Sequence, residues 1–160
     1  MKNTNTLTEQ IINTLKQNKQ TLSFAESCTG GRLASAFTAI SGASSVFNGS
    51  CVTYSNEIKH LWLGVENQVL EEFGAVSREC VAQMLSGMSQ MAKSDYTIAV
   101  SGIAGPSGGT ELKPVGTVFI GIRTPLKQEV FHCLFEGSRE EIQAKATVFS
   151  IKKLALFLQI

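Results

Sequence analysis

Apolar residues recur every three or four positions in several segments of this chain, which is the spacing of one face of an α-helix. The first of these segments starts at Thr6 and Glu9, whose spacing matches a capping box, and the last starts with the same spacing at Ser138 and Glu141. Ser77 is placed to cap another helix. The predicted helices lie near residues 6–15, 31–40, 56–63, 67–73, 77–88 and 138–158.

Short apolar runs between these helices predict β-strands. They lie over residues 22–25, 50–54, 96–100, 116–122 and 129–135. The first three runs alternate with helices, as in a parallel arrangement, whereas the last two flank a turn-forming segment at residues 124–127 and predict an antiparallel pair. The pattern therefore predicts an α/β fold, a three-layer α/β/α sandwich with a mixed, mostly parallel sheet, with residues 1–160 forming a single domain.

The composition is that of one globular domain without a dominant charge. The 160 residues are 43% hydrophobic and carry a formal net charge of +1. This suits a sizeable core, and it argues against duplex DNA or an anionic membrane as a partner. No apolar run reaches the ~20 residues that span a bilayer. We see no signal peptide and expect a cytoplasmic protein with four free thiols, at Cys28, Cys51, Cys80 and Cys133.

The motifs do not point to metal or dinucleotide chemistry. The two histidines, His60 and His132, have no ligand spacing with each other or with a cysteine. Neither lies near the serine-rich loops, where a Ser-His-Asp hydrolase would need one. The glycine patterns of phosphate loops and dinucleotide sites do not occur. We therefore expect no metal and no cofactor, and turn to hydroxyl, phenol and amine side chains.

The richest candidate site is residues 25–31 (AESCTGG), between the first predicted strand and the next helix. A carboxylate, two hydroxyls and a thiol precede two glycines, which let the backbone approach a ligand closely. Open α/β sheets bind ligands at such strand-to-helix junctions, where free N–H groups can hold an anion. The same residues also fit an ordinary capped helix start, so the motif alone leaves both interpretations open.

A second candidate follows the second predicted strand, at Tyr54 and Lys59. On a helix that starts near Asn56, Lys59 lies about one turn in and can point back toward the strand ends. A lysine with a pKa lowered by desolvation can serve as the base for a serine nucleophile, and Tyr54 can relay the proton or donate to an oxyanion. The alternative is a solvated lysine and a tyrosine that covers a sheet edge.

Five segments follow one another along the chain in an order that resembles a known family. They are residues 25–31 (AESCTGG), 52–59 (VTYSNEIK), 73–77 (FGAVS), 101–106 (SGIAGP) and 113–118 (KPVGTV). Together they resemble the CinA C-terminal domain family, the nicotinamide-nucleotide amidohydrolases, from about Leu7 to Leu158. The extra N-terminal domain of full-length CinA proteins is not seen in this sequence, so the chain resembles the stand-alone deamidase form.

The resemblance implies an activity. The family hydrolyses the carboxamide of nicotinamide mononucleotide (NMN) to nicotinate mononucleotide and ammonia, a reaction of pyridine nucleotide salvage and NAD metabolism. It implies a metal-free Ser-Lys site, no cofactor, a three-layer α/β/α fold and a homodimer. By the same resemblance Ser44 is expected as the nucleophile, Lys59 as the general base and Tyr54 as a proton relay or orienting group. Ser27 and Ser45 are the alternative nucleophiles.

Substrate binding is expected around the same loops. The resemblance implies that Ser27, Thr29 and nearby backbone N–H groups hold the amide and the developing oxyanion. Arg139 matches a family arginine and can pair with the substrate phosphate through its planar fork. The full set of expected substrate-binding residues is Glu26, Cys28, Gly30, Gly31, Ser45, Gly102, Ala104, Gly105 and Arg139.

Two positions depart from the family pattern. Gln143 stands where the family often has a basic residue, which bears on phosphate binding, and Ala43 stands where relatives often have serine. Two other functions stay open at this point. One is a non-catalytic nucleotide-binding module, and the other is a competence-related interaction domain, against which the near-neutral charge argues.

Overall fold

A computed structural model describes residues 3–160 of the chain, which form five strands and six helices. Along the sequence these are α1 (Thr4–Asn18), β1 (Leu22–Glu26), α2 (Arg32–Thr38), the 3₁₀ turn η1 (Ala43–Ser45), β2 (Phe47–Val52), α3 (Asn56–Leu63), α4 (Asn67–Glu72), α5 (Arg78–Ala92), β3 (Tyr96–Gly102), β4 (Thr117–Arg123), β5 (Gln128–Leu134) and α6 (Arg139–Phe157).

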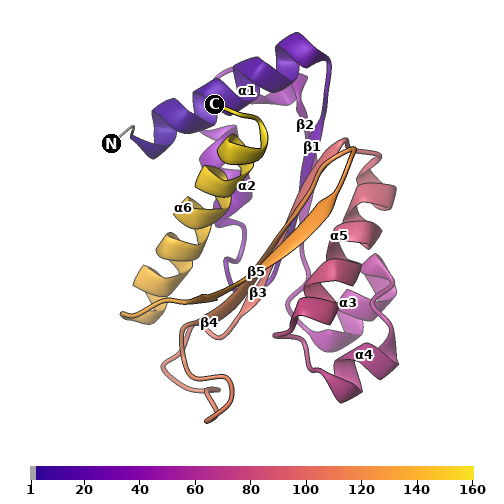
Figure 1. Ribbon diagram of the computed structural model, residues 1–160, viewed down its shortest axis with the longest axis vertical. Coiled ribbons are helices and arrows are strands. Elements are labelled where there is room, and N and C mark those ends of the chain that lie inside the picture. The colour runs from indigo at the N-terminus through magenta and orange to yellow at the C-terminus, as the bar shows by residue number, and fades with distance from the viewer. Residues whose placement is uncertain (1–2) are drawn as a thin grey trace.

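The strands form one mixed sheet in the order β2-β1-β3-β4-β5. β1 pairs in parallel with β2 and β3, whereas β4 is antiparallel to both β3 and β5, so β4 alone runs against the other strands. Helices α1, α2 and α6 cover one face of this sheet and α3, α4 and α5 cover the other (Figure 1). The three-layer α/β/α fold with a mixed sheet is thereby confirmed.

Each face of the sheet has its own apolar core. Phe24, Ile98 and Ile120 point toward α1, α2 and α6, and neighbouring positions with small side chains point toward α5. The absence of a side chain at Gly121 lets α5 pack close, because a Cβ there would lie 2.5 Å from Cδ1 of Leu85. Among residues 3–160, no helix combines the length and apolar character needed to cross a membrane.

The helix caps follow the sequence signals at two sites and depart from them at a third. Ser77 caps α5, and Ser138 forms a complete capping box with Glu141 at the start of α6. The predicted cap at Thr6 is wrong, because α1 starts two residues earlier and Asn3 supplies the capping oxygen. Asn3 lies four residues before the apolar stripe, which starts at Leu7, and its side chain caps the helix in place of Thr6. Asparagine is at least as favourable as threonine at this position.

The ends of β1 and β2 place polar side chains on opposite faces of the sheet. β2 begins at Phe47, three residues before the predicted start, and ends beside Glu26 of β1. Successive strand side chains alternate between faces. Glu26 therefore points toward α2, whereas Ser27, which continues the strand line, points toward α3 and α5.

Glu26 is fully buried and serves as the cap of α2. Its Oε2 accepts hydrogen bonds from the backbone N–H groups of Gly31 and Leu33 at 3.1 Å each, and its Oε1 accepts one from Ala34 N–H at 3.0 Å. The hydroxyls of Thr29 and Ser50 donate to the same carboxylate at 2.8 and 3.1 Å. A negative charge at a helix start satisfies orphan N–H donors and complements the helix dipole.

The Glu26→Gln substitution tests this structural role. We expect it to lower the free energy of unfolding by about 2–4 kcal/mol, because an amide places donors against buried N–H and O–H groups. Urea denaturation followed by circular dichroism measures the change, with Glu71→Gln on exposed α4 as the control. A Glu26→Gln protein as stable as the parent would show that the carboxylate does not hold α2.

Candidate active site

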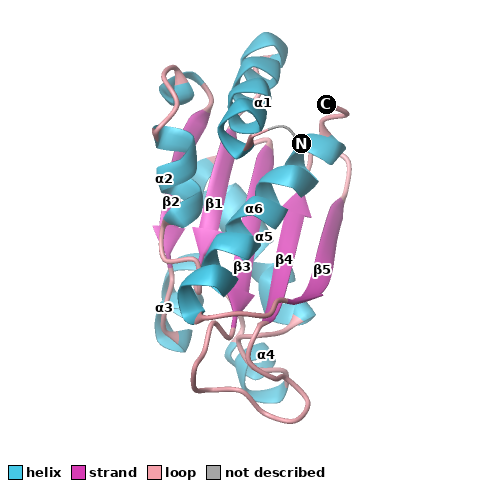
Figure 2. Ribbon diagram, turned by 90° about the vertical axis from the view of Figure 1, so that its left-hand side faces the viewer, coloured by secondary structure: helices cyan, strands magenta, loops and turns pink. Residues whose placement is uncertain are grey.

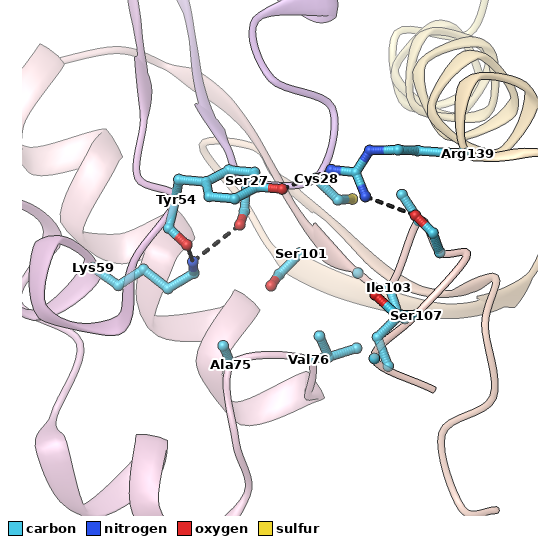
Figure 3. Close-up of a pocket in the computed structure, with 14 residues that line it drawn as sticks. Ser27, Cys28, Tyr54, Lys59, Ala75, Val76, Ser101, Ile103, Ser107 and Arg139 are labelled. Atoms are coloured by element: carbon cyan, nitrogen blue, oxygen red, sulfur yellow. Dashed lines mark hydrogen bonds between the residues drawn. The ribbon is translucent and has the colours of Figure 1, made fainter. Parts of the chain in front are cut away.

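A pocket of about 280 Å³ opens at the carboxyl ends of β1, β2 and β3 (Figure 3). Open α/β sheets bind ligands at this edge. The loop between β3 and β4 extends beyond the sheet at the same end of the molecule (Figure 2). The pocket is lined by Ser27, Cys28, Tyr54, Lys59, Ala75, Val76, Ser101, Gly102, Ile103, Ala104, Gly105, Ser107, Gly108 and Arg139.

The side chains of Lys59 and Ser27 meet in this pocket. Lys59 is only 1% exposed, and its Nζ donates to Ser27 Oγ at 3.0 Å. The same nitrogen donates to the backbone carbonyls of Thr53 at 2.7 Å and Tyr54 at 3.3 Å. Lys59 thus lies beside Ser27, the residue expected as an alternative nucleophile. Its amine also contacts the backbone of Thr53 and Tyr54, in the segment that joins β2 to α3.

The position of Lys59 follows from how α3 begins and packs. Ser55 caps the helix by accepting from Ile58 N–H at 3.2 Å, which fixes the first turn beneath the end of β2. Farther along, α3 presses against α5 at Gly87, where an added Cβ would fall 1.8 Å from the carbonyl oxygen of Leu63. Lys59 lies one turn before Leu63 on the same helix and is itself only 1% exposed.

Burial lowers the pKa of Lys59 below its ordinary value of 10.5. A neutral lysine amine keeps two N–H groups and gains a lone pair. The two carbonyl oxygens, of Thr53 and Tyr54, can take both N–H groups, which leaves the lone pair for the hydroxyl of Ser27. This is the geometry of a general base that withdraws a proton from a serine nucleophile.

Cys28 also lines the pocket, but its thiol is unsuited to nucleophilic attack. Burial raises the pKa of Cys28 to about 12, so the thiol remains protonated near neutral pH. Among residues 3–160, no group of three or more His, Cys, Asp or Glu side chains is placed to hold a metal ion.

Arg139 forms the outer wall of the pocket together with Tyr54. Its guanidinium donates to the hydroxyl of Tyr54 at 2.8 Å and to the carbonyl of Gly105 at 2.7 Å. Arg139 and Lys59 are the basic residues among the described residues that line this pocket, and no acidic residue lines it with them. Arg139, exposed at the mouth, therefore favours an anionic group on the ligand.

One turn farther along α6, Gln143 reaches the turn that follows the nucleophile candidate. The Gln143 side chain is buried, and its Nε2 donates to the carbonyl of Cys28 at 2.8 Å. Gln143, which stands where the family often has a basic residue, therefore points into the protein and contacts the backbone of Cys28. Together, Arg139 and Gln143 attach the start of α6 to the loops that follow β1, β2 and β3.

Ser44 and Ser45 do not belong to this site, which corrects the expectation that Ser44 attacks the substrate. Both are exposed on η1, before β2, and Ser45 Oγ donates to Gly42 O at 2.8 Å. Val46 O accepts from Leu22 N–H at the start of β1, so the length of that strand, about 15 Å, separates Ser44 from Ser27. Ser44 precedes β2 and Lys59 follows it, so the two residues lie at opposite ends of that strand.

Four other expected residues hold the turn and do not line the pocket. Thr29 donates to Glu26, and Gly31 uses its N–H for the same carboxylate. Gly30 and Gly31 adopt positive φ angles of 57° and 97°, which let the chain turn sharply into α2. Glu26, Thr29, Gly30 and Gly31 therefore do not contact the pocket directly, but they form the turn that positions Ser27. Cys28, Tyr54, Lys59, Gly102, Ala104, Gly105 and Arg139 line the pocket as expected.

Several lining residues were not among the expected site residues. Ser101 is the penultimate residue of the buried strand β3, and Ala75 and Val76 come from the segment between α4 and α5. Both segments contain motifs that the sequence comparison with the family had singled out. Nothing in the types or spacing of these three residues indicates a catalytic or binding role, and only the fold shows that they line the same pocket as Ser27.

Comparison with known proteins agrees with this architecture. The model of the family described as "CinA C-terminal domain" matches residues 4–158. A CinA-like protein of Pseudothermotoga lettingae is 44% identical over 146 residues, 91% of this chain and 36% of that protein. One from Endomicrobium trichonymphae is 51% identical over 131 residues, 82% of this chain and 31% of that protein. The chain thus spans about a third of the length of these curated relatives.

Solved structures of similar size match almost end to end. A CinA superfamily protein of Klebsiella pneumoniae is 35% identical, with a TM-score of 0.94 and 99% of both chains covered. A competence/damage inducible protein of Agrobacterium tumefaciens is 34% identical, with a TM-score of 0.94, 98% of this chain and 96% of that chain covered. The sequence motifs and the fold agree with these matches, and this chain belongs to the CinA C-terminal domain family.

Proposed function

We propose that this chain is an amidohydrolase that converts NMN to nicotinate mononucleotide and ammonia, with Ser27 as nucleophile and Lys59 as general base. The observation that carries the proposal is the 3.0 Å contact between Lys59 Nζ and Ser27 Oγ inside a closed corner of the pocket. A binding module has no need for a lysine amine that is buried and directed at a hydroxyl. The family resemblance supplies the substrate.

In the first half-reaction, Ser27 Oγ attacks the carboxamide carbon while its proton passes to the lone pair of Lys59. The carbonyl oxygen takes the negative charge of the tetrahedral intermediate. As the intermediate collapses, the C–N bond breaks and Lys59 returns the proton to the leaving nitrogen, which departs as ammonia. The acyl group remains on Ser27 as an ester.

In the second half-reaction, water enters the position that ammonia has left. Lys59 takes a proton from this water as its oxygen attacks the ester carbon. Collapse of the second intermediate breaks the bond to Ser27 Oγ, which regains its proton from Lys59. Nicotinate mononucleotide forms as the carboxylic acid, whose remaining proton passes to the released ammonia or to solvent and leaves a carboxylate. Both side chains return to their starting protonation states.

The pocket suits a mononucleotide. Its volume of about 280 Å³ lies at the small end of ligand pockets, which typically measure about 300–1,000 Å³. Arg139 offers a cation at the mouth, while Lys59 lies at the inner end. A substrate with its phosphate at Arg139 can therefore present the carboxamide to Ser27. Arg139 would exchange its bond to Tyr54 for a bidentate contact with the phosphate, which its planar fork favours.

Loss of either side chain of the pair should abolish turnover. We expect Ser27→Ala and Lys59→Met to lower kcat for ammonia release from NMN by at least about 10³-fold, because removal of either member of such a pair disables the whole unit. Ser44→Ala is the matched serine control and should keep near-parent activity. Ammonia is measured with EDTA present, so that adventitious metals do not contribute.

Two outcomes would contradict this assignment. If Ser27→Ala keeps parent-like turnover and Ser44→Ala loses it, the nucleophile is Ser44 on η1 and not Ser27. No turnover in the parent protein, combined with a rise in melting temperature on adding NMN, would favour a nucleotide-binding module.

The pH dependence follows from the direction of the Lys59 pKa. Protonated Lys59 cannot accept the proton of Ser27, so kcat/KM should rise with pH and level off at the pKa of Lys59, below 10.5. Steady-state assays across the neutral and alkaline range measure this limb. An activity that declines as pH rises from neutral would show that the lysine acts as an ammonium and not as a base.

A further inference from the structure

Ser101 supplies a buried hydroxyl in the pocket that the two steps above do not use. It lies on β3, is 1% exposed and lines the cavity. Figure 3 shows its Oγ directed into the space beside Ser27 and Lys59. Within residues 3–160, this oxygen makes no hydrogen bond to another protein group.

Other buried serine hydroxyls in this chain are paired. Ser23 Oγ contacts Ser94 Oγ at 2.6 Å, and Ser150 Oγ donates to Ala146 O at 2.8 Å. The Thr53 hydroxyl also lacks a partner, but it is sealed from solvent and does not line the pocket. The Ser101 hydroxyl is instead unpaired by the protein groups that the structure describes and faces the open cavity, where a ligand can take the place of water as its hydrogen-bond partner.

The sheet register places Ser101 next to the nucleophile. Glu26 pairs with Val100, and Ser27 N–H continues the ladder by donating to Val100 O at 3.0 Å. The next residues on the two parallel strands, Ser27 and Ser101, therefore point to the same face of the sheet. Neighbouring strands lie about 4.8 Å apart, which is the spacing needed for two side chains to contact one small group from adjacent directions.

Lys59 cannot supply the hydrogen bond that the reacting oxygen needs. When its lone pair faces Ser27, its two N–H groups are held by the carbonyls of Thr53 and Tyr54. The negative charge that develops on the carboxamide oxygen must therefore meet other donors. A hydroxyl that is free in the resting pocket can turn its proton to that oxygen without breaking a bond to the protein.

We propose that Ser101 is a further catalytic residue, whose hydroxyl donates a hydrogen bond to the carbonyl oxygen of the scissile carboxamide. This inference rests on the proposed amidohydrolase function. The bond strengthens as Ser27 attacks and the oxygen becomes an anion, so it lowers the barrier more than it tightens substrate binding. No covalent bond to Ser101 forms, and its proton stays on its own oxygen.

The first test compares variants at this position. Ser101→Ala should lower kcat for ammonia release from NMN by about 10²–10³-fold with a smaller change in KM, as removal of one oxyanion donor does. Ser101→Thr keeps a hydroxyl on a β-strand and should recover most of the lost rate. Ser150→Ala is the matched control, because it removes another fully buried serine hydroxyl outside the pocket.

A sulfur-substituted substrate separates direct contact from a structural effect. The thiocarboxamide of NMN has a sulfur that accepts hydrogen bonds weakly. Replacing oxygen by sulfur should therefore lower kcat in the parent protein at least tenfold more than in Ser101→Ala, which has already lost the donor. A change in packing alone would leave the two penalties equal.

The outcomes separate this inference from the proposed function. If the parent protein releases no ammonia from NMN, the proposed function fails and the role of Ser101 fails with it. If the parent protein is active, the inference alone is overturned by parent-like kcat in Ser101→Ala, by failure of Ser101→Thr to recover rate, or by equal sulfur penalties in the parent and Ser101→Ala.

Discussion

The site depends on the burial of one amine, that of Lys59. Removing an ammonium from water is expensive, and the fold lessens the cost by bringing two backbone carbonyls and the Ser27 hydroxyl to that nitrogen. The desolvation that remains is what lowers the pKa of Lys59. Lys59 lies on α3, which packs closely on α5 at Gly87.

Two features of the fold organise the pocket around that amine. Strand alternation directs Glu26 to one face, where it caps α2, and Ser27 to the other, where it meets Lys59. On the far side, Arg139 and Gln143 at the start of α6 bind the loops after the three parallel strands. The turn that carries Ser27 is thus fixed by a buried carboxylate before it and by a glutamine after it.

The fold class could be predicted from the sequence, because helical stripes, caps and apolar runs are local patterns. The tertiary packing of this protein keeps the elements that those patterns favour. The predicted positions of Lys59 and Tyr54 after the second strand, and the family resemblance for Arg139, pointed to three residues that line the pocket. The prediction failed for Ser44, since motif order does not reveal which edge of the sheet a loop occupies. Ser101 was missed because a serine at the end of a buried strand has no distinctive pattern, and only register places it beside Ser27.

The most direct test of this account is a titration of Lys59 itself, by NMR of the protein labelled with nitrogen-15 at lysine side chains. The Lys59 resonance is identified by its loss in Lys59→Met. We predict that it titrates at a pKa below the ordinary lysine value of 10.5, in agreement with the pH limb of the activity. A Lys59 that titrates at 10.5 or above would contradict the central claim that burial prepares this amine as a base.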